Sequence, residues 1–543
     1  MGCCKCEEHK WDDPQPVVYT DPEDGKEYCL FHAPAEHKGL SVVDFNQQVY
    51  AIIEVATDTG KSCNLSGVIF PGDISFSRFK IENPLPEIDF EKSIFEGNTR
   101  FNSTFFSENV FFKSITAVKK IQFTSATCLG DFYLDNATFC SEAYFDKVEF
   151  HGLCNMRKVL FKSSVYWCNS TFREKTIVNE SKFKSYCFLN EVLFCKSVSF
   201  SKNEFDNANF KSATLNGKTS FNETIFMGHA LFDHTGFNSD VEFTNTNFKK
   251  LAFFNRTEFA KKVSFFWSRF CDKTVFSKVK FKSVVCFDNV EFDKYVEFVY
   301  IVCPKGMKFN TVFFKQALMT MKTSVPSLHF VQCTNGKVGL TLLGIELKEC
   351  FFLYSDMTNV HFLKSYWSIK DGRYHISSED SDNPEWQAIR DFYQSMKRKY
   401  KAENNEYEAS KWHIAEKEAQ LKLLRQNGES RLLCFALWLY KLVSGFGENP
   451  VRAFWVLLGL IVLPLLVLLV GACMDVQIDF FGWTFYSSPT ADVIGEWLKF
   501  IPLTRAIKGT EPSALRALMF LWQLLITVQA ALFAFALRNR FRR

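Results

Sequence analysis

The 543-residue chain has none of the short motifs that carry common enzymatic chemistry. It contains no phosphate-binding glycine motif, no G-x-S-x-G, no H-E-x-x-H and no pair of carboxylates in a catalytic context. Its ten histidines are scattered, and a lone one such as His361 is more often a structural polar residue than a catalyst. We therefore expect that the protein is not an enzyme and that it uses no organic cofactor.

The chain also lacks a strong charge of either sign. Its 64 basic and 60 acidic residues leave a net charge of +4, and the lysines are scattered without a basic run. Because a nucleic-acid partner requires a clustered basic surface, none is expected. The N-terminal segment is polar and carries no secretory signal, so we expect a reducing cytoplasm in which the 18 cysteines remain thiols.

Phenylalanine, by contrast, is in large excess, with 61 residues, and its positions follow a constant period. From Phe221 to Phe298 two series with a step of eleven residues interleave, so that the spacing alternates between five and six. The position two residues before each Phe is small or β-branched, as at Ala230 and Thr235. Because alternating steps of five and six do not return to one helical face, the pattern indicates a repeat architecture. The core residues it predicts include Phe221, Phe226, Phe232, Phe237, Phe243, Phe248, Phe254, Phe259, Phe265 and Phe270.

The ladder extends upstream to Phe79, with a slip at Phe205, Phe210 and Leu215, where five-residue units follow one another. This alternation resembles the Phe-rich variant of the pentapeptide-repeat family. The resemblance implies a mainly β fold, a right-handed quadrilateral β-helix with four units, or 22 residues, in each coil. Residues 70–335 would then form about twelve coils, which stack to about 55 Å at the usual strand spacing. A sandwich or a barrel would not predict such a period.

The net charge of the chain helps to distinguish between members of that family with different functions. Members that imitate DNA and bind gyrase depend on an acidic surface. The net charge of +4 argues against that role for this chain.

Residues 1–40 carry two short pairs of metal-binding residues. Cys3-x-x-Cys6 and Cys29-x-x-His32 have the spacing of a structural zinc site, in which two knuckles supply four tetrahedral ligands. The segment is rich in proline and poor in core residues, so a metal would help it to fold. The segment resembles the Cys/His leader that precedes Phe-rich pentapeptide repeats in some bacterial proteins.

Other interpretations of this segment stay open from the sequence. Cys4, His9 and His37 are spare donors that could replace one of the four ligands. The segment could instead be a loosely ordered tail whose cysteine thiols are accessible to oxidation. Gly2 followed by Cys3 and Cys4 also looks like a dual-acylation start, although Cys6 stands where Ser or Thr is usual.

The remaining soluble parts follow from periodicity and turn signals. Residues 41–69 predict an amphipathic helix that caps the first coil, because an open coil presents unpaired strand edges. Residues 336–370 predict degenerate terminal coils. Residues 371–430 predict a polar linker at 371–383, then a helical hairpin that starts at Asn383-Pro384.

The C-terminal part predicts a membrane hairpin. The expected order is an interfacial helix at 431–450, a transmembrane helix at 451–473, an extracytoplasmic loop at 474–513, a second transmembrane helix at 514–537 and a basic tail at 538–543. Basic residues precede the first span and follow the second. Both termini and the β-helix are therefore expected on the cytoplasmic side of an inner membrane.

Three polar residues stand out inside the second span. Gln523, Thr527 and Gln529 are costly in lipid, and such residues usually face another helix or water. An oligomer interface is the first interpretation and a pore lining is the second. The loop lacks the T-x-G-[YF]-G run of a potassium filter.

Two functions therefore remain open. The first is a membrane-anchored scaffold whose β-helix binds a protein partner. The second is an oligomeric ion channel or membrane-permeabilising effector with two helices per subunit, gated by the β-helix. The expected partners are the lipid bilayer, further copies of the chain in a homo-oligomer, and a protein that the sequence does not name.

Overall fold

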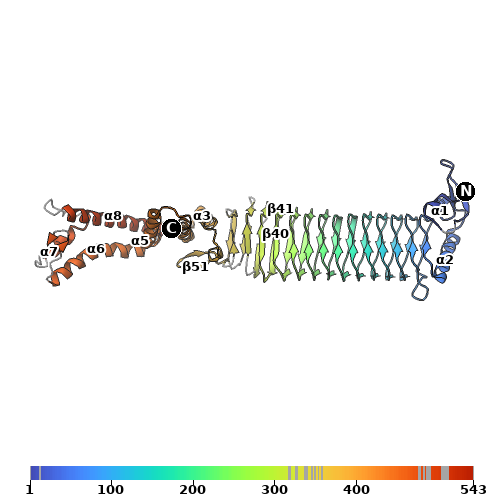
Figure 1. The fold of residues 1–543 in the computed structure, drawn as a ribbon, viewed down its shortest axis with the longest axis horizontal. Coiled ribbons are helices and arrows are strands. Elements are labelled where there is room, and N and C mark those ends of the chain that lie inside the picture. Colours follow the sequence, from blue (N-terminus) through green and yellow to red (C-terminus); the bar gives the residue numbers. More distant parts are fainter. Residues whose placement is uncertain are drawn as a thin grey trace. The chain divides into compact units, whose positions relative to one another are not determined.

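The computed structural model describes residues 2–11, 14–315, 320–324, 328–335, 340–343, 347, 350–352, 354–355, 357, 359–474, 479–480, 483–484, 491–502 and 513–541. The chain divides into two compact units, Met1–Tyr366 and Trp367–Arg543. Stacked short strands make up most of the first unit, and the second unit is mostly helical (Figure 1).

The first unit is a parallel β-solenoid with four short strands in each turn. Strand β11 (Thr116–Ala117) pairs with β15 (Thr138–Phe139), so that residues 22 positions apart lie side by side. One face is a 14-stranded parallel sheet, and the other faces form a sheet of 34 strands that runs from β4 (Ile69–Phe70) to β50 (Val360–Leu363). The 14-stranded face consists of β3 (Cys63–Asn64), β6 (Ile88–Asp89), β10 (Val110–Phe111), β14 (Phe132–Tyr133), β18 (Cys154–Asn155), β22 (Thr176–Ile177), β25 (Val198–Ser199), β28 (Thr219–Ser220), β32 (Val241–Glu242), β36 (Val263–Ser264), β40 (Val285–Asp288), β43 (Met307–Asn310), β46 (Leu328–Val331) and β49 (Cys350–Phe351).

The mainly β solenoid predicted from the repeat is thus confirmed. Its strands begin seven residues before the predicted start at 70 and continue past 335 to Leu363. The slip in the ladder is accommodated within the pairing, because Leu193 lies beside Thr214 and this turn is one residue shorter.

The phenylalanine ladder forms the core of the solenoid as stacked columns. Phe221 and Phe243 occupy equivalent positions in successive turns, and their rings stack with centroids 4.9 Å apart and an interplanar angle of 4°. Phe232, midway between them in sequence, meets Phe221 edge to face at 5.7 Å and 82°. Both arrangements are favourable for aromatic pairs. The ten predicted core phenylalanines from Phe221 to Phe270 are all buried.

The small inward residues complete each turn of the core. Thr235, Thr246 and Thr257 are buried, and each hydroxyl donates to a backbone carbonyl of the preceding turn. The Thr257 hydroxyl, for example, lies 2.7 Å from the carbonyl oxygen of Phe232. A threonine at this position therefore fills the space beside the Phe column without leaving a polar group unpaired.

Helix α2 (Val42–Thr59) covers the first turn of the solenoid. Ser41 caps its N-terminus by accepting from the backbone N–H of Asp44, and Gly60 ends it in the left-handed conformation. Phe45 is buried on the inner face of α2 and meets Phe70 of the solenoid edge to face at 6.1 Å. Helix α2 thereby covers the apolar end of the core, as a terminal cap must.

The second unit begins with a small folded region at residues 368–380, where the sequence predicts a linker. Strands β51 (Ser368–Lys370) and β52 (Arg373–His375) pair antiparallel, and the 3₁₀ helix η3 (Ser377–Asp380) follows. Helices α3 (Trp386–Ala402) and α4 (Glu406–Gln426) form the predicted hairpin, with α3 starting two residues after Pro384. Trp412 of α4 is fully buried among Trp367, Tyr374, Phe392 and Tyr393.

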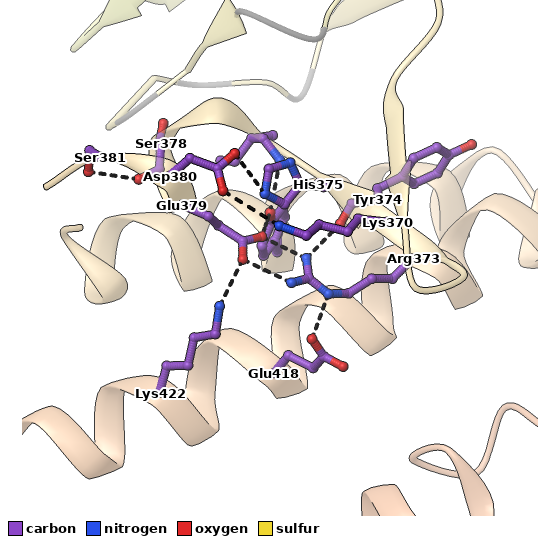
Figure 2. A network of polar contacts seen from close by, with 12 residues as sticks. Lys370, Arg373, Tyr374, His375, Ser378, Glu379, Asp380, Ser381, Glu418 and Lys422 are labelled. Atoms are coloured by element: carbon purple, nitrogen blue, oxygen red, sulfur yellow. Dashed lines mark hydrogen bonds and ion pairs between the residues drawn. The ribbon is translucent and has the colours of Figure 1, made fainter. Parts of the chain in front are cut away.

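A buried ionic network explains why this polar stretch folds (Figure 2). Arg373 of β52 contacts both oxygens of Glu379, at 2.6 and 2.9 Å, and its Nε donates to Glu418 of α4 at 2.6 Å. Lys422 and the Tyr393 hydroxyl also donate to Glu379. Burial alone would raise the pKa of Glu379, but the Arg373 guanidinium and these donors lower it to about 2.

Four further helices follow in the described part of the second unit. Helix α5 (Arg431–Ser444) exposes large apolar side chains, among them Leu432 and Phe435. Helix α6 (Pro450–Met474) and helix α8 (Ser513–Phe541) lie beside one another, and Trp522 donates from Nε1 to the Leu460 carbonyl at 2.9 Å. Helix α7 (Ala491–Leu498) contacts α6, where Trp497 Nε1 donates to the Ile461 carbonyl.

Helices α6 and α8 contain the two candidate membrane spans, Pro450–Val470 and Ser513–Phe541. Both are long and apolar enough to cross a bilayer, and only 17% of each apolar window is buried within the protein. A core helix of a soluble protein would be mostly buried. Residues 475–478, 481–482, 485–490 and 503–512 of the predicted loop 474–513, and Arg542 and Arg543 of the predicted basic tail, lie outside the described residues.

Candidate metal centre

Four buried side chains from the N-terminal segment converge on one point. The Sγ atoms of Cys3, Cys6 and Cys29 and the Nδ1 atom of His32 all lie within 4.8 Å of one another. His32 Nδ1 is 3.4, 3.5 and 3.2 Å from the sulfurs of Cys3, Cys6 and Cys29, and the sulfurs of Cys6 and Cys29 are 3.6 Å apart. A tetrahedral ion with ordinary zinc bond lengths requires separations of about 3.5 Å for S···N and about 3.8 Å for S···S. The cluster therefore has the size of a tetrahedral metal site.

Local structure supplies these ligands from two short turns. Helix α1 (Cys4–Glu8) begins just after Cys3, so Cys3 and Cys6 lie one turn apart on the same side. Strand β1 (Val17–Thr20) pairs with β2 (Glu27–Cys29), and this hairpin brings Cys29 back to α1. The backbone N–H groups of His32 and Ala33 both donate to the Cys29 carbonyl, which folds His32 toward the sulfurs.

The first turn of the solenoid holds the histidine in position. Nε2 of His32 donates to the carbonyl of Ser66 at 3.0 Å, which leaves the lone pair of Nδ1 available to bind a metal. The indole of Trp11 lies against the His32 ring and donates to the same carbonyl. Gly67 has a φ of +73°, and a Cβ atom there would lie 2.6 Å from His9 Nε2, so both the backbone and the available space favour glycine. The centre is thus built onto the end of the solenoid.

Burial shifts the pKa values of three of the four candidate ligands. Burial lowers the pKa of His32 to about 4, so its ring is neutral at ordinary pH. Burial raises the pKa of Cys6 and Cys29. Because thiolates are the ligands, binding of a metal would release their protons.

Lys38 is the residue here that sequence reasoning missed. It is buried, and its Nζ donates to the carbonyls of Leu30 and Phe31 at 2.6 and 3.1 Å, between the ligands Cys29 and His32. Burial lowers the pKa of Lys38 to about 7, and a charged Cys29 would raise it again. Three thiolates and one imidazole around a divalent ion would carry a charge of −1, which a protonated Lys38 would offset. Only its place six residues after His32 hinted at this role.

The spare donors predicted from the sequence lie outside the cluster. His9 stacks on the far side of His32 at 6.1 Å, and His37 stacks against Tyr19 at 4.1 Å. Cys4 is half-buried and is not part of the four. Cys3 is fully buried among the other donors, which does not suit an acylated cysteine.

The three polar residues predicted inside the second span do not all share one face, since Gln523 and Thr527 are one turn apart and Gln529 lies on another side. Gln529 is buried, and its Nε2 donates to the carbonyls of Val443 and Ala453 at 3.1 and 2.9 Å. Nε2 of Gln523 donates to the Lys499 carbonyl at 2.7 Å. The exposed Thr527 donates to the carbonyl of Gln523 within the helix. Both amides therefore bond within the unit.

Comparison with protein-family models, curated proteins and solved structures found no match for the chain. Its class therefore follows from the structure. It is a β-solenoid repeat protein with two candidate membrane-spanning helices. At the N-terminal end of the solenoid, a buried cluster of three cysteines and one histidine could hold a metal ion.

Proposed function

We propose that the protein is a membrane-anchored pentapeptide-repeat scaffold whose solenoid lies in the cytoplasm and binds a protein partner. The observation that carries this proposal is a row of aromatic side chains on one outer face of the solenoid. The 5+6 spacing of the Phe ladder and the 22-residue turn support the pentapeptide-repeat assignment. Helices α6 and α8 supply the anchor.

The row consists of Tyr144, Tyr166 and Phe188, here called the aromatic stripe. These residues point outward from β16 (Ala143–Tyr144), β20 (Val165–Tyr166) and β23 (Lys182–Phe188), which pair side by side. Their rings stack at 4.8 and 5.0 Å. Tyrosine and phenylalanine on a rigid, flat surface are typical anchors of protein interfaces, because they bury a large area at a small cost in entropy.

A second outward pair provides a matched control. Phe111 and Tyr133 stack at 5.2 Å on the 14-stranded face. Nζ of Lys113 lies over both rings, at 5.2 and 4.8 Å. This pair is therefore already covered by a cation.

The test is photo-crosslinking in cells from Tyr186, which is 53% exposed and stacks on Phe188. We expect one defined protein to be captured by the wild-type chain. Serine at all three stripe positions should abolish its capture, and the F111S/Y133S variant should retain it. Equal capture by both variants would contradict the scaffold proposal.

For the metal centre we propose zinc. Three thiolates and one imidazole in a closed tetrahedron suit a structural zinc ion, which needs no open coordination position. Zinc would tie residues 3–32 together and so stabilise the end of the solenoid. The chemistry it supplies is structural.

The alternative function, an oligomeric channel, has less support. The sequence supports it by a polar Gln/Thr face on the second span and by a two-span topology like that of simple channels. The amides of Gln523 and Gln529, however, bond within their own unit. Ion flux through liposomes that contain the purified chain would still decide in its favour.

A further inference from the structure

Two adjacent hollows lie at the end of α8 where its apolar stretch gives way to arginines. Their volumes are 340 and 210 Å³. Both are lined by Glu406 and Ser410 of α4, by Glu448 of the α5–α6 connection and by Asn539 of α8. Together they form one polar depression between the helical hairpin and the C-terminal end of α8, here called the junction site.

Basic side chains outnumber acidic ones around the junction site. Lys397, Lys401 and Arg538 line the smaller hollow, and Lys411 and Arg540 line the larger one. The carboxylates that line the two hollows are those of Glu406 and Glu448. Among the lining side chains, basic groups therefore exceed carboxylates by three.

Three of these cations are available to a ligand. Lys397 pairs with Glu416, and Lys411 pairs with Glu408. Within the described residues, Lys401, Arg538 and Arg540 form no ion pair with a carboxylate. Burial raises the pKa of Glu448, which favours its uncharged form and weakens its repulsion of an anion.

The walls of the junction site are held in place by hydrogen bonds. Nδ2 of Asn539 donates to the Gly447 carbonyl at 3.2 Å, and Gln529 ties α8 to Val443 and Ala453. A Cβ atom on Gly447 would lie 2.6 Å from the Tyr440 hydroxyl and 3.0 Å from Phe535, so the loop and α8 are in close contact. Such preorganisation lowers the entropy lost when a ligand binds.

An exposed apolar side chain lines the site, and the helix that precedes it exposes more. Phe535 lines the smaller hollow and is 41% exposed. Helix α5, which leads into the loop at Gly445, exposes Leu432, Phe435 and Leu442. A free anion would need only the basic groups, whereas a phospholipid also needs an adjoining apolar surface for its acyl chains.

We propose that the junction site binds the phosphoryl headgroup of an anionic phospholipid through Lys401, Arg538 and Arg540. This inference rests on the proposed membrane anchor. It requires that the N-terminal end of α6 and the C-terminal end of α8 lie at the headgroup level of a bilayer. Basic pockets between membrane helices bind such headgroups, and each Lys or Arg near an anionic surface strengthens binding about fivefold.

The test measures phosphatidylglycerol binding to the full-length chain in detergent by native mass spectrometry. The K401Q/R538Q/R540Q variant should bind at least tenfold more weakly, since about 1 kcal/mol per cation corresponds to about fivefold each. The control K250Q/R398Q/R425Q removes the same charge from exposed positions outside the site and should bind within twofold of wild type. Phosphatidylcholine should bind weakly to all three.

Flotation with phosphatidylcholine vesicles distinguishes a failure of the proposed membrane anchor from a failure of the headgroup site alone. If the wild-type chain does not float, the membrane anchor is wrong and the headgroup site is wrong with it. If all the chains float and the triple variant retains phosphatidylglycerol as well as wild type, only the headgroup site is wrong. Displacement of the lipid by excess inorganic phosphate would also overturn the proposal, because the site would then be one for a free anion.

Discussion

At the scale of single residues, the four candidate ligands have the most direct consequence. They are buried, they are spaced for a tetrahedral ion, and the first turn of the solenoid orients the histidine through Ser66. Removal of one ligand from a structural zinc site strongly lowers the affinity of the site for the metal.

We predict that Cys29→Ser lowers the bound zinc from one ion per chain to almost none. Metal analysis of the purified chain measures this directly. Hydrogen exchange should increase in residues 3–33, since the knuckles lose their shared ligand. Cys4→Ser, which changes a cysteine next to the cluster, should keep the full complement of zinc; a C29S variant that keeps it as well would contradict the assignment.

A second residue-scale prediction concerns Glu379. Its folded pKa of about 2 lies below the ordinary value of 4.5, so its ion pairs contribute stability that is present above about pH 4.5. That contribution is lost as the pH falls from 4.5 toward 2, because the carboxylate is then protonated. Glu379→Gln should lower the stability of this region by about 3 kcal/mol at neutral pH, because Arg373 remains buried.

Thermal unfolding followed by near-ultraviolet ellipticity is the suitable measurement, because Trp412 and its aromatic neighbours lie beside the network. The E379Q variant should also lose part of the change in midpoint between pH 4.5 and pH 2; the rest belongs to Glu416, whose pKa burial alone would raise but His413 and Lys397 lower to about 2. Asp391→Asn, which breaks an exposed ion pair with Arg390, should change the midpoint little. Equal effects of the two substitutions would contradict the role of the buried network.

At the scale of the element, one turn of the solenoid is the unit of stability. Each turn contacts only its neighbours, so a core substitution acts locally. Phe243 stacks on Phe221 and Phe265 at 4.9 and 5.0 Å and is fully buried. Loss of its ring leaves a cavity that two columns share.

We predict that Phe243→Ala destabilises the adjoining turns by about 3–5 kcal/mol. Hydrogen exchange should increase in the strands on either side and remain unchanged near the N-terminal cap. Phe253→Ala, ten residues later but facing outward and half-buried, should cost about 1 kcal/mol or less. If Phe253→Ala were the more harmful change, the inward and outward assignment would be wrong.

At the scale of the whole molecule, the order of charged and apolar segments sets the expected topology. Lys441 and Arg452 stand before or at the start of the first candidate span, and Arg538 and Arg540 stand at the end of the second. Two spans return the chain to the side from which it started. From the positive-inside rule we predict that both ends lie on the cytoplasmic side.

A reporter that is active only in the cytoplasm, fused after Arg543, should therefore be active. The same reporter inserted in the loop between the two spans should be inactive. The reverse pattern would mean that the solenoid lies outside the cell, and the search for its partner would move there. Replacing Arg538 and Arg540 with glutamine should reduce the C-terminal activity, since these residues contribute to the orientation.

The sequence by itself determined the features that repeat or that lie close together in the chain. The Phe ladder predicted the solenoid, because the 22-residue spacing recurs along most of it. The two C-x-x pairs predicted which four side chains meet, because each pair lies within one turn of backbone. The apolar runs predicted the two candidate spans, because length and composition suffice for that.

Only the tertiary structure decided the partners that are far apart in sequence. The stretch 371–383 reads as a polar linker, and it folds because Arg373 meets Glu418, 45 residues away. Lys38 and Ser66 complete the metal centre from outside its motifs. Gln529 bonds to carbonyls 86 and 76 residues earlier and so faces its own unit. A buried polar group needs a hydrogen-bond partner, and the fold supplies it from any part of the chain. Local sequence patterns do not predict partners that are far apart in sequence.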